Sequence, residues 1–271
     1  MPDALGIGVD SRTSGPRVRS WGMPWRPGED LRALLELVAP AGCAGCGRSG
    51  HRLCPDCLGQ LHATGPRPWR PTPCPPGFPP TWSGPAYQGV LPALVVAWKE
   101  QDRVDLTGAL GDVLRGAVAA AVAGSPEHRD ALRAGRPVAV LPAPSAAAST
   151  RSRGRCPVRE LAVVAAGTRR AVVPALVLTR AVADQAGLSA GQRAANLGGA
   201  VRVRPGLVGA LAGVPCVVVD DVVTTGATLA ECARALRQAG AGRVVAATVA
   251  ATARRGRADS EPALSRTGEP D

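Results

Sequence analysis

The sequence contains few lysine, histidine and aromatic residues. Lys99 is the only lysine, so arginine supplies every other basic side chain. His51, His62 and His128 are the only histidines, and none of them offers a Ser-His catalytic triad. Aromatic residues make up 3% of the chain, which counts against a nucleic-acid surface built on stacked bases. The composition therefore supports contact with phosphate better than base stacking.

Positive charge is in clear excess. The 32 basic and 21 acidic residues give a net charge of +11 at pH 7 and a pI of ≈ 10.4. Because the planar fork of arginine suits bidentate contact with phosphate, a polyanionic partner is one explanation. A GC-rich genome that encodes arginine in place of lysine is the other. Net charge does not separate a nucleic acid from a phosphorylated metabolite.

The sequence shows neither an export signal nor a long apolar run. The first ten residues, MPDALGIGVD, lack the basic start and apolar core of a signal peptide. The most apolar stretches, 116–124 and 138–148, are far too short to cross a bilayer. We therefore expect a cytoplasmic protein without a transmembrane segment. Its cysteines should then be reduced and serve as ligands or core residues.

Apolar strands alternate with amphipathic helices over most of the chain. Continuous apolar strands separated by helices predict an α/β fold, with a parallel sheet flanked by helices on both faces. The predicted strands cover residues 137–144, 175–180, 213–221 and 242–250, and the predicted helices cover residues 91–100, 105–124, 157–170 and 226–240.

The composition also suggests where domains begin and end. The stretch GPRPWRPTPCPPGFPP is dense in proline and is typical of a stiff linker. The predicted parts are a disordered N-terminus at 1–27, a helix and cysteine module at 28–62, the linker at 63–80, a large domain at 81–253 and a flexible tail at 254–271.

Four cysteines form two C-x-x-C pairs separated by seven residues. Each pair can present two thiolates from a tight turn, and two such turns close a tetrahedral zinc site around Cys43, Cys46, Cys54 and Cys57. Four thiolates leave no position for water, so the zinc would be structural. Free thiols or a redox pair are the alternatives, and His51 is interpreted as a loop residue and not as a ligand.

The other four cysteines lack such spacing. No C-x-x-C pair includes any of them: Cys74, Cys156, Cys216 and Cys232. Cys216 and Cys232 lie in a predicted strand and a predicted helix, and we interpret them as small core residues.

The stretch VVVDDVVTTGATL, residues 217–229, has the pattern strand, short loop, helix. Ligands of a parallel sheet bind beyond the carboxyl ends of its strands, where Asp220 and Asp221 must lie. The loop ends at a helix N-terminus, whose free N–H groups and dipole favour an anion. Its residues are Val222, Val223, Thr224, Thr225, Gly226, Ala227 and Thr228.

These residue types suit the two ends of a ribose 5-phosphate. The threonine hydroxyls are donors to phosphate, and Gly226 lets the backbone close on it. Asp220 and Asp221 suit vicinal sugar hydroxyls, or water around a divalent cation. A strand that stops at an acidic turn with a threonine N-cap is the structural alternative.

This stretch closely resembles the phosphoribosyl-diphosphate (PRPP) motif of type I phosphoribosyltransferases. The cysteine module and residues 87–111, 141–154 and 178–203 follow in the order seen in the ComF family. Members of that family are competence-associated, phosphoribosyltransferase-like proteins with an N-terminal zinc finger. The resemblance covers roughly residues 31 to 253, and it implies a type I phosphoribosyltransferase fold over the domain at 81–253.

The resemblance also implies roles for particular residues. Asp220 and Asp221 would be catalytic and contact the ribose, and residues 224–228 would cradle the 5′-phosphate, so that PRPP binds along residues 220–228. The remaining residues are a pyrophosphate loop of Pro142, Ala143, Pro144 and Ser145, helped by Arg151 and Arg153, and a mobile hood with Arg180, Gln185, Arg193 and Asn196.

The implied reaction is the transfer of phosphoribose from PRPP, with Mg²⁺, to a nitrogen nucleophile. The family's competence association suggests an alternative, a non-catalytic DNA-uptake factor that binds single-stranded DNA and the DNA-uptake machinery. Where the family commonly reads Arg-Gly-Phe-Asn-Gln, this chain continues from Arg153 with Gly154, Arg155, Cys156 and Pro157, a change that bears on base selection and turnover. Lys99 resembles a family lysine, and we expect it at a solvated helix end.

Overall fold

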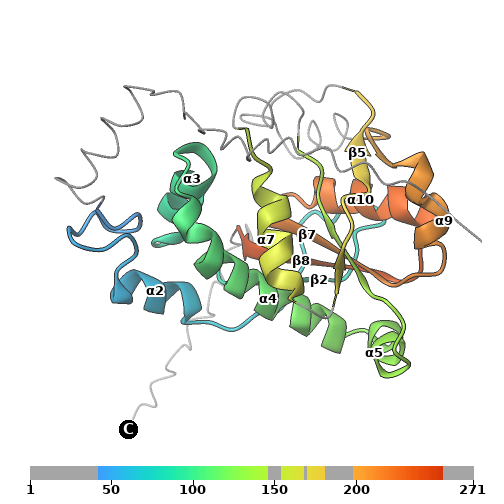
Figure 1. Ribbon diagram of the computed structural model, residues 1–271, viewed down its shortest axis with the longest axis horizontal. Coiled ribbons are helices and arrows are strands. Elements are labelled where there is room, and N and C mark those ends of the chain that lie inside the picture. Colours follow the sequence, from blue (N-terminus) through green and yellow to red (C-terminus); the bar gives the residue numbers. More distant parts are fainter. Residues whose placement is uncertain (1–41, 146–153, 168–169, 181–197, 253–271) are drawn as a thin grey trace, which may run out of the picture. The chain divides into compact units, whose positions relative to one another are not determined.

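A computed structural model describes residues 42–145, 154–167, 170–180 and 198–252 (Figure 1). All of them belong to one compact unit, Ala41–Asp271. The predicted helix at 28–40, the N-terminus at 1–27 and the tail at 254–271 lie outside the described residues. So do Arg151, Arg153, Gln185, Arg193 and Asn196.

A six-stranded sheet forms the centre of this unit. Neighbouring strands are parallel except at the β1–β2 edge, which is antiparallel. In sheet order the strands are β1 (Arg67–Trp69), β2 (Thr81–Ser83), β8 (Val244–Ala251), β7 (Cys216–Val223), β3 (Ala139–Pro142) and β4 (Ala171–Val172). Every residue of β8 is buried, as expected for a parallel strand covered on both faces.

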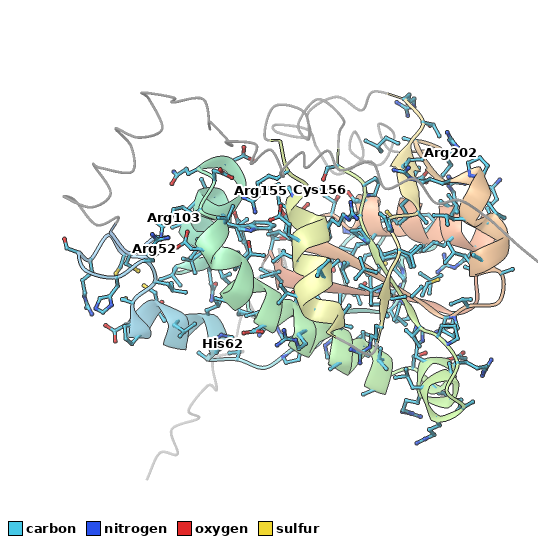
Figure 2. The ribbon with its side chains drawn as sticks, viewed as in Figure 1. Arg52, His62, Arg103, Arg155, Cys156 and Arg202 are labelled. Carbon is cyan, nitrogen blue, oxygen red and sulfur yellow. The ribbon has the colours of Figure 1, made fainter. Side chains whose placement is uncertain are left out.

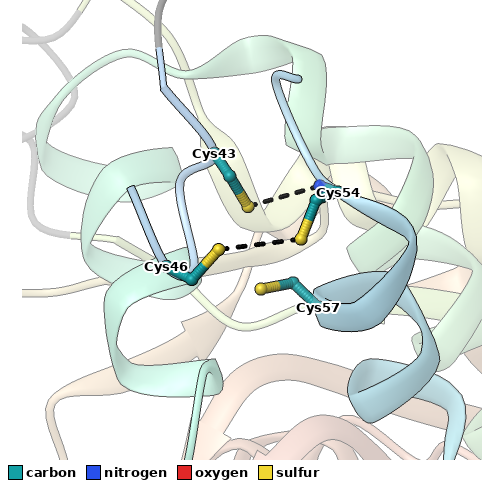
Figure 3. Close-up of side chains that lie close together, drawn as sticks. All are labelled: Cys43, Cys46, Cys54 and Cys57. Atoms are coloured by element: carbon teal, nitrogen blue, oxygen red, sulfur yellow. Dashed lines mark hydrogen bonds between the residues drawn. The ribbon is translucent and has the colours of Figure 1, made fainter. Parts of the chain in front are cut away.

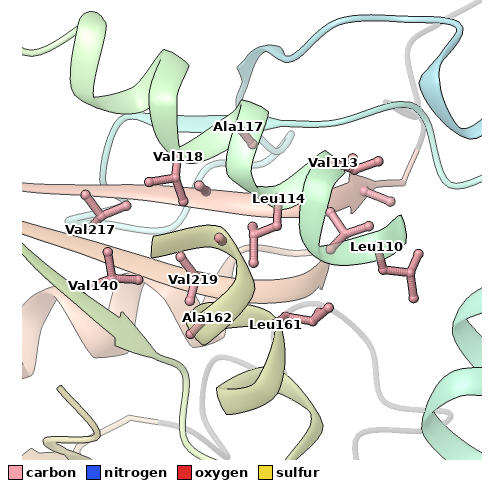
Figure 4. Close-up of a cluster of buried hydrophobic side chains, with 14 of the residues drawn as sticks. Leu110, Val113, Leu114, Ala117, Val118, Val140, Leu161, Ala162, Val217 and Val219 are labelled. Carbon is pink, nitrogen blue, oxygen red and sulfur yellow. The ribbon is translucent and has the colours of Figure 1, made fainter. Parts of the chain in front are cut away.

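Helices cover both faces of the sheet. Because successive side chains of a strand point to opposite faces, Val217 and Val219 of β7 pack on one side and Cys216 and Val218 on the other. The first side is covered by α3 (Leu91–Glu100), α4 (Thr107–Ala123) and α7 (Pro157–Ala166), and the second by α10 (Ala227–Gln238). Figure 4 shows α4 and α7 packed on Val140, Val217 and Val219. The predicted α/β class is confirmed.

Shorter helices connect these elements. They are α2 (Pro55–His62), η1 (Val104–Leu106), α5 (Pro126–Arg133), η2 (Pro205–Leu207) and α9 (Val208–Leu211). Cys216 and Cys232 are fully buried, as predicted for small core residues.

The segment Val104–Ala123 is the one helix of the described residues whose length and composition would suit a membrane, with a mean hydropathy of 1.4. All of it except the first three residues belongs to α4, which packs against α7 and β8. Leu114, Ala117 and Val118 of α4 are completely buried there. A core helix meets the same criteria of length and composition, and this packing accounts for the apolar sequence.

The predicted strand at 175–180 forms as β5 (Leu176–Leu178), but it is not part of the parallel sheet. It pairs antiparallel with β6 (Val201–Val203) in a separate two-stranded sheet. Two of its three residues are half-buried, so it lacks the cover on both faces that a central parallel strand has. β6 is tied to α10, because Glu231 Oε1 accepts a hydrogen bond from the Val201 N–H at 3.1 Å.

The stretch expected to be a linker contains the edge strand β1. Trp69 of β1 is buried, and its ring meets Phe78 edge-on, with centroids 6.2 Å apart. Arg237 of α10 donates a hydrogen bond of 2.7 Å to the carbonyl of Gly77. These contacts hold the proline-rich stretch against the sheet and α10, so it is packed into the unit and does not separate two bodies.

Candidate functional site

The acidic pair lies at the carboxyl end of β7. The strand runs two residues further than predicted, to Val223, so Val222 and Val223 belong to the strand and not to the loop. Alternation along the strand turns the two carboxyl groups to opposite faces. Asp220 lines a cavity together with residues 222–229, and Asp221 turns toward Lys99. Each carboxylate also accepts the N–H of the next residue, at 2.9 Å for Asp220 and 2.8 Å for Asp221.

The loop after the strand ends at the N-terminus of α10, as predicted. Gly226 is the N-cap residue and has a left-handed backbone with φ of 76°. Thr225 Oγ1 accepts a long hydrogen bond of 3.4 Å from the Ala227 N–H. The cavity that Asp220 shares with this loop measures about 20 Å³, enough for one water molecule. A phosphate group would therefore sit at its mouth, beside the first turn of the helix.

A segment distant in sequence covers the back of this loop. A Cβ added at Gly226 would lie 2.6 Å from the Phe78 ring and 3.1 Å from Pro71. Two separate features therefore require glycine at position 226: the positive φ of the backbone and the close approach of the aromatic ring. The sequence prediction missed this contact, because the proline-rich stretch was interpreted as a linker.

Lys99 is a further residue of this end of the sheet, and the expectation of a solvated helix end was wrong. Its Nζ lies 2.5 Å from Asp221 Oδ2, although 122 residues separate the two. The side chain of Asp221 is 9% exposed and that of Lys99 35%, so the ion pair is partly shielded from water. The signal in the sequence was that the only lysine falls in the last turn of a mostly apolar helix.

Electrostatics differ between the two aspartates. Burial, and then the charge of Asp221, raise the pKa of Asp220 to about 8, while Lys99 opposes the rise. The raised pKa favours the protonated form of Asp220, which can donate a hydrogen bond as well as accept one. The pKa of Tyr87 is also raised, by burial and then by the charge of Asp221, while Lys99 opposes the rise.

The predicted pyrophosphate loop begins where β3 ends. The Ala143 N–H donates to the Val219 carbonyl at 2.8 Å, which brings the loop beside the strand of the acidic pair. Residues 142–145 line a second, much larger cavity of about 500 Å³. Arg180, from the predicted hood, donates to the Gly198 carbonyl at 3.3 Å. It follows β5, so the predicted hood connects the two strands of the small sheet.

Arg155, where the chain departs from the ComF pattern, joins two helices. It makes two hydrogen bonds to Glu160 of α7, at 3.1 and 2.5 Å. Its third nitrogen donates to the Trp98 carbonyl at 2.9 Å and to Asp102 at 3.2 Å, and the guanidinium lies 5.7 Å from the Trp98 ring centroid. Figure 2 places it at the start of α7. Because Lys99 follows Trp98 directly, Arg155 fixes the helix end that carries the lysine.

The four cysteines of the predicted zinc site come together (Figure 3). All four sulfur atoms lie within 4.8 Å of one another, and Cys46 and Cys54 are 3.6 Å apart. A tetrahedral zinc with Zn–S bonds of about 2.3 Å needs sulfurs about 3.8 Å apart, so the cluster can hold such an ion. A Cβ at Gly45 would lie 2.8 Å from Cys57 Sγ, which explains that glycine.

The thiols of this cluster are electrostatically unequal. Burial would raise the pKa of Cys43, but N–H donors, led by that of Cys54 at 3.3 Å, outweigh it and lower the pKa to about 6. Burial and the neighbouring sulfurs raise the pKa of Cys57 far above its usual value. A divalent cation would relieve this conflict, because it stabilises every thiolate at once. His51 is exposed and is not one of the four ligands.

The cysteine module is attached to the end of the helix that carries Lys99. Arg103 donates to the carbonyls of Arg52 at 2.8 Å and Gly42 at 3.4 Å, and it forms an ion pair with Asp105 at 2.8 Å. Figure 2 shows Arg52 and Arg103 close together at this junction. The module thus packs against the α3–α4 connection.

Residues 161–267 match the family model described as the phosphoribosyl transferase domain. The match runs from α7 beyond β8 and includes the acidic pair and the loop that follows it. No curated protein matches the chain. The narrower resemblance to ComF proteins therefore stays a prediction. The family match, the mostly parallel sheet and the strand–loop–helix unit at its edge support a domain of the type I phosphoribosyltransferase kind.

Proposed function

We propose that this protein binds PRPP with Mg²⁺ at the carboxyl end of β7 and transfers phosphoribose to a nitrogen nucleophile. One observation carries the proposal. Asp220 and residues 222–229 surround a single cavity at a helix N-terminus, within the segment that matches the phosphoribosyl transferase domain. This is the place where a parallel sheet binds phosphorylated ligands.

Each part of the site has a task in this proposal. The first turn of α10 and the hydroxyls of Thr224, Thr225 and Thr228 bind the 5′-phosphate. Asp220, which lines the cavity, binds the ribose hydroxyls and is a donor while it is protonated. Asp221 lies on the opposite face of β7, where Lys99 holds it, and its charge acts on Asp220. The carboxylates also offer the hard oxygen ligands that Mg²⁺ prefers, and the ion when bound would offset the charge of the pyrophosphate.

The leaving group would be received beside β3. Backbone amides of residues 142–145, with Arg151 and Arg153, would hold the pyrophosphate as it leaves. Closure of the hood with Arg180, Gln185, Arg193 and Asn196 would exclude water from the sugar. Such chemistry depends on positioning and electrostatics and needs no nucleophilic side chain of the protein.

Calorimetry with PRPP and Mg²⁺ tests this proposal. We expect saturable binding to the wild-type protein, at least about tenfold weaker binding to Asp220→Asn/Asp221→Asn, and no change in Asp130→Asn, whose carboxylate is exposed on α5. Pyrophosphate release in the presence of amines and nucleobases then measures transfer. Equal PRPP affinities of the wild type and the double variant would contradict the site.

We also propose that the cysteine cluster holds a structural zinc ion in a cytoplasmic protein. Four sulfur ligands leave no position for a reacting water, which supports a structural role. All eight cysteines are free, in keeping with a reducing compartment. Metal analysis of the purified protein should find one zinc per chain, and a chain purified without any metal would contradict the proposal.

A non-catalytic DNA-uptake factor is the second candidate. The net charge of +11 and the resemblance to competence-associated proteins favour it. Such a protein should bind single-stranded DNA tightly, with an affinity that falls steeply as salt rises. Tight DNA binding without any response to PRPP would decide for this candidate.

A further inference from the structure

The larger cavity, beside β3, has a lining of its own. Its volume of about 500 Å³ falls within the usual range for small-molecule sites. Residues 142–145, the first turn of α7, Pro174, β5 and Arg204 surround it. Among the described residues, it shares no lining residue with the small cavity of Asp220 and the loop.

Its walls are mainly apolar and its charges have one sign. Most of the lining consists of proline, alanine, leucine and valine side chains from the end of β3 and from β5. Arg159, in the first turn of α7, and Arg204, just after β6, line it as well. No acidic residue lines it within the described chain. Both arginines are exposed, and within the described chain neither side chain has a hydrogen-bond or ion-pair partner.

We infer that this cavity binds a small organic carboxylate with an apolar body. Apolar walls bind carbon surface, and two guanidinium groups without partners bind a carboxylate strongly. Pyrophosphate alone would leave the apolar walls without a partner, and a neutral apolar molecule would make no contact that uses the two exposed guanidinium groups. The N-terminus of α7, which has ten residues, adds a field of the same sign.

The inference does not rest on the proposed function, because the cavity can be tested without PRPP. The cavity and the proposed PRPP site are nevertheless neighbours. Residues 142–145 line this cavity and also form the predicted pyrophosphate loop. A carboxylate bound there changes the affinity for PRPP, and PRPP changes the affinity for the carboxylate by the same factor.

A titration of the full chain with 2-naphthoate, followed by ligand-observed NMR, tests the site. The neutral 2-naphthamide has the same shape without the charge. We expect saturable binding of naphthoate, and binding at least about tenfold weaker for naphthamide and for Arg159→Gln/Arg204→Gln. The control is Arg133→Gln/Arg136→Gln, which removes two exposed arginines outside this lining and should bind naphthoate as the wild type does. Equal binding by the wild type and the Arg159/Arg204 variant, or no binding at all, would overturn the inference.

Cys156 provides a second readout, because it lines the cavity and is half-exposed. Naphthoate should slow alkylation of Cys156 by N-ethylmaleimide, measured by peptide mass spectrometry, and naphthamide should not. Pyrophosphate with Mg²⁺ should shift the affinity for naphthoate to a new constant value. If increasing pyrophosphate instead lowers the affinity for naphthoate without limit, pyrophosphate and naphthoate compete for one site. The cavity would then be part of the PRPP site and not a separate carboxylate site. The PRPP calorimetry is independent of each of these results.

Discussion

The cysteine module and the acidic end of β7 are two sites built in different ways. In the module, residues 43–57 supply all four sulfur atoms of the cluster. At the end of β7, the motif supplies Asp220 and the loop, but Lys99 comes from 122 residues away. Phe78, which covers the loop at Gly226, also comes from outside the motif.

The difference has a physical cause. A metal ion needs only a few ligand atoms at fixed spacing, and two tight turns provide them locally. A site at a sheet edge receives side chains from every element that packs there, and their sequence positions depend on topology. A local motif can thus identify where such a site lies without identifying all of its members. The following experiments test this contrast.

Loss of one cysteine ligand should have the largest effect. Cys46→Ser should lower the zinc content severalfold and destabilise the module by at least about 3 kcal/mol, because metal binding contributes directly to folding. Metal analysis and thermal unfolding measure the two effects. Cys74→Ser, outside the cluster, should change neither, and wild-type zinc content in Cys46→Ser would show that the ligand set is wrong.

Gly226→Ala should destabilise the protein by about 2–4 kcal/mol, from strain at positive φ and from the clash with Phe78. Gly240→Ala is the matched control. Gly240 has nearly the same φ, 77°, but its added Cβ would meet nothing within 4 Å, so only about 1 kcal/mol is expected. Denaturant unfolding measures both. If both variants lost the same free energy of unfolding, Phe78 of the proline-rich stretch would not be in close contact with the loop.

Arg155→Met should cost about 1–3 kcal/mol, because it leaves Glu160 and the Trp98 carbonyl without their partner. It should also weaken PRPP binding, since the end of α3 carries Lys99. Arg133→Met, which breaks an exposed ion pair on α5, should change stability by less than about 0.5 kcal/mol. Unchanged stability of Arg155→Met would contradict the role of Arg155 in joining α3 and α7.

A further test concerns the pH dependence of stability. The pKa of Asp220 is about 8 in the folded protein and near 3.8 when unfolded, so the folded state binds more protons between these values. The stability contribution of this group is complete below about pH 4 and is lost as pH rises toward 8. Asp220→Asn should remove this decline, measured by unfolding at pH 5 to 9.

Lys99→Met should extend the decline to higher pH, because Lys99 holds the pKa of Asp220 down. The same unfolding series measures it. Identical curves for Lys99→Met and the wild type would show that the lysine does not act on the acidic pair.

Much of the fold could be predicted from the sequence. Apolar runs marked β3, β7 and β8, and periodicity marked α3, α4, α7 and α10, because each pattern reflects burial along one element. β1 was missed, since proline-rich composition resembles a linker even where the chain pairs at a sheet edge. The position of β5 was also missed, because a short apolar strand does not reveal the sheet to which it belongs.

The sequence by itself determined the cysteine cluster and the strand–loop–helix unit that follows Cys216, because spacing within a few residues dictates both. Only the tertiary structure decided that Lys99 pairs with Asp221, that Phe78 lies against Gly226 and that Arg159 and Arg204 line one cavity. Such contacts arise when helices and strands pack on a common sheet. Packing depends on the arrangement of whole elements, which spacing along the chain does not specify.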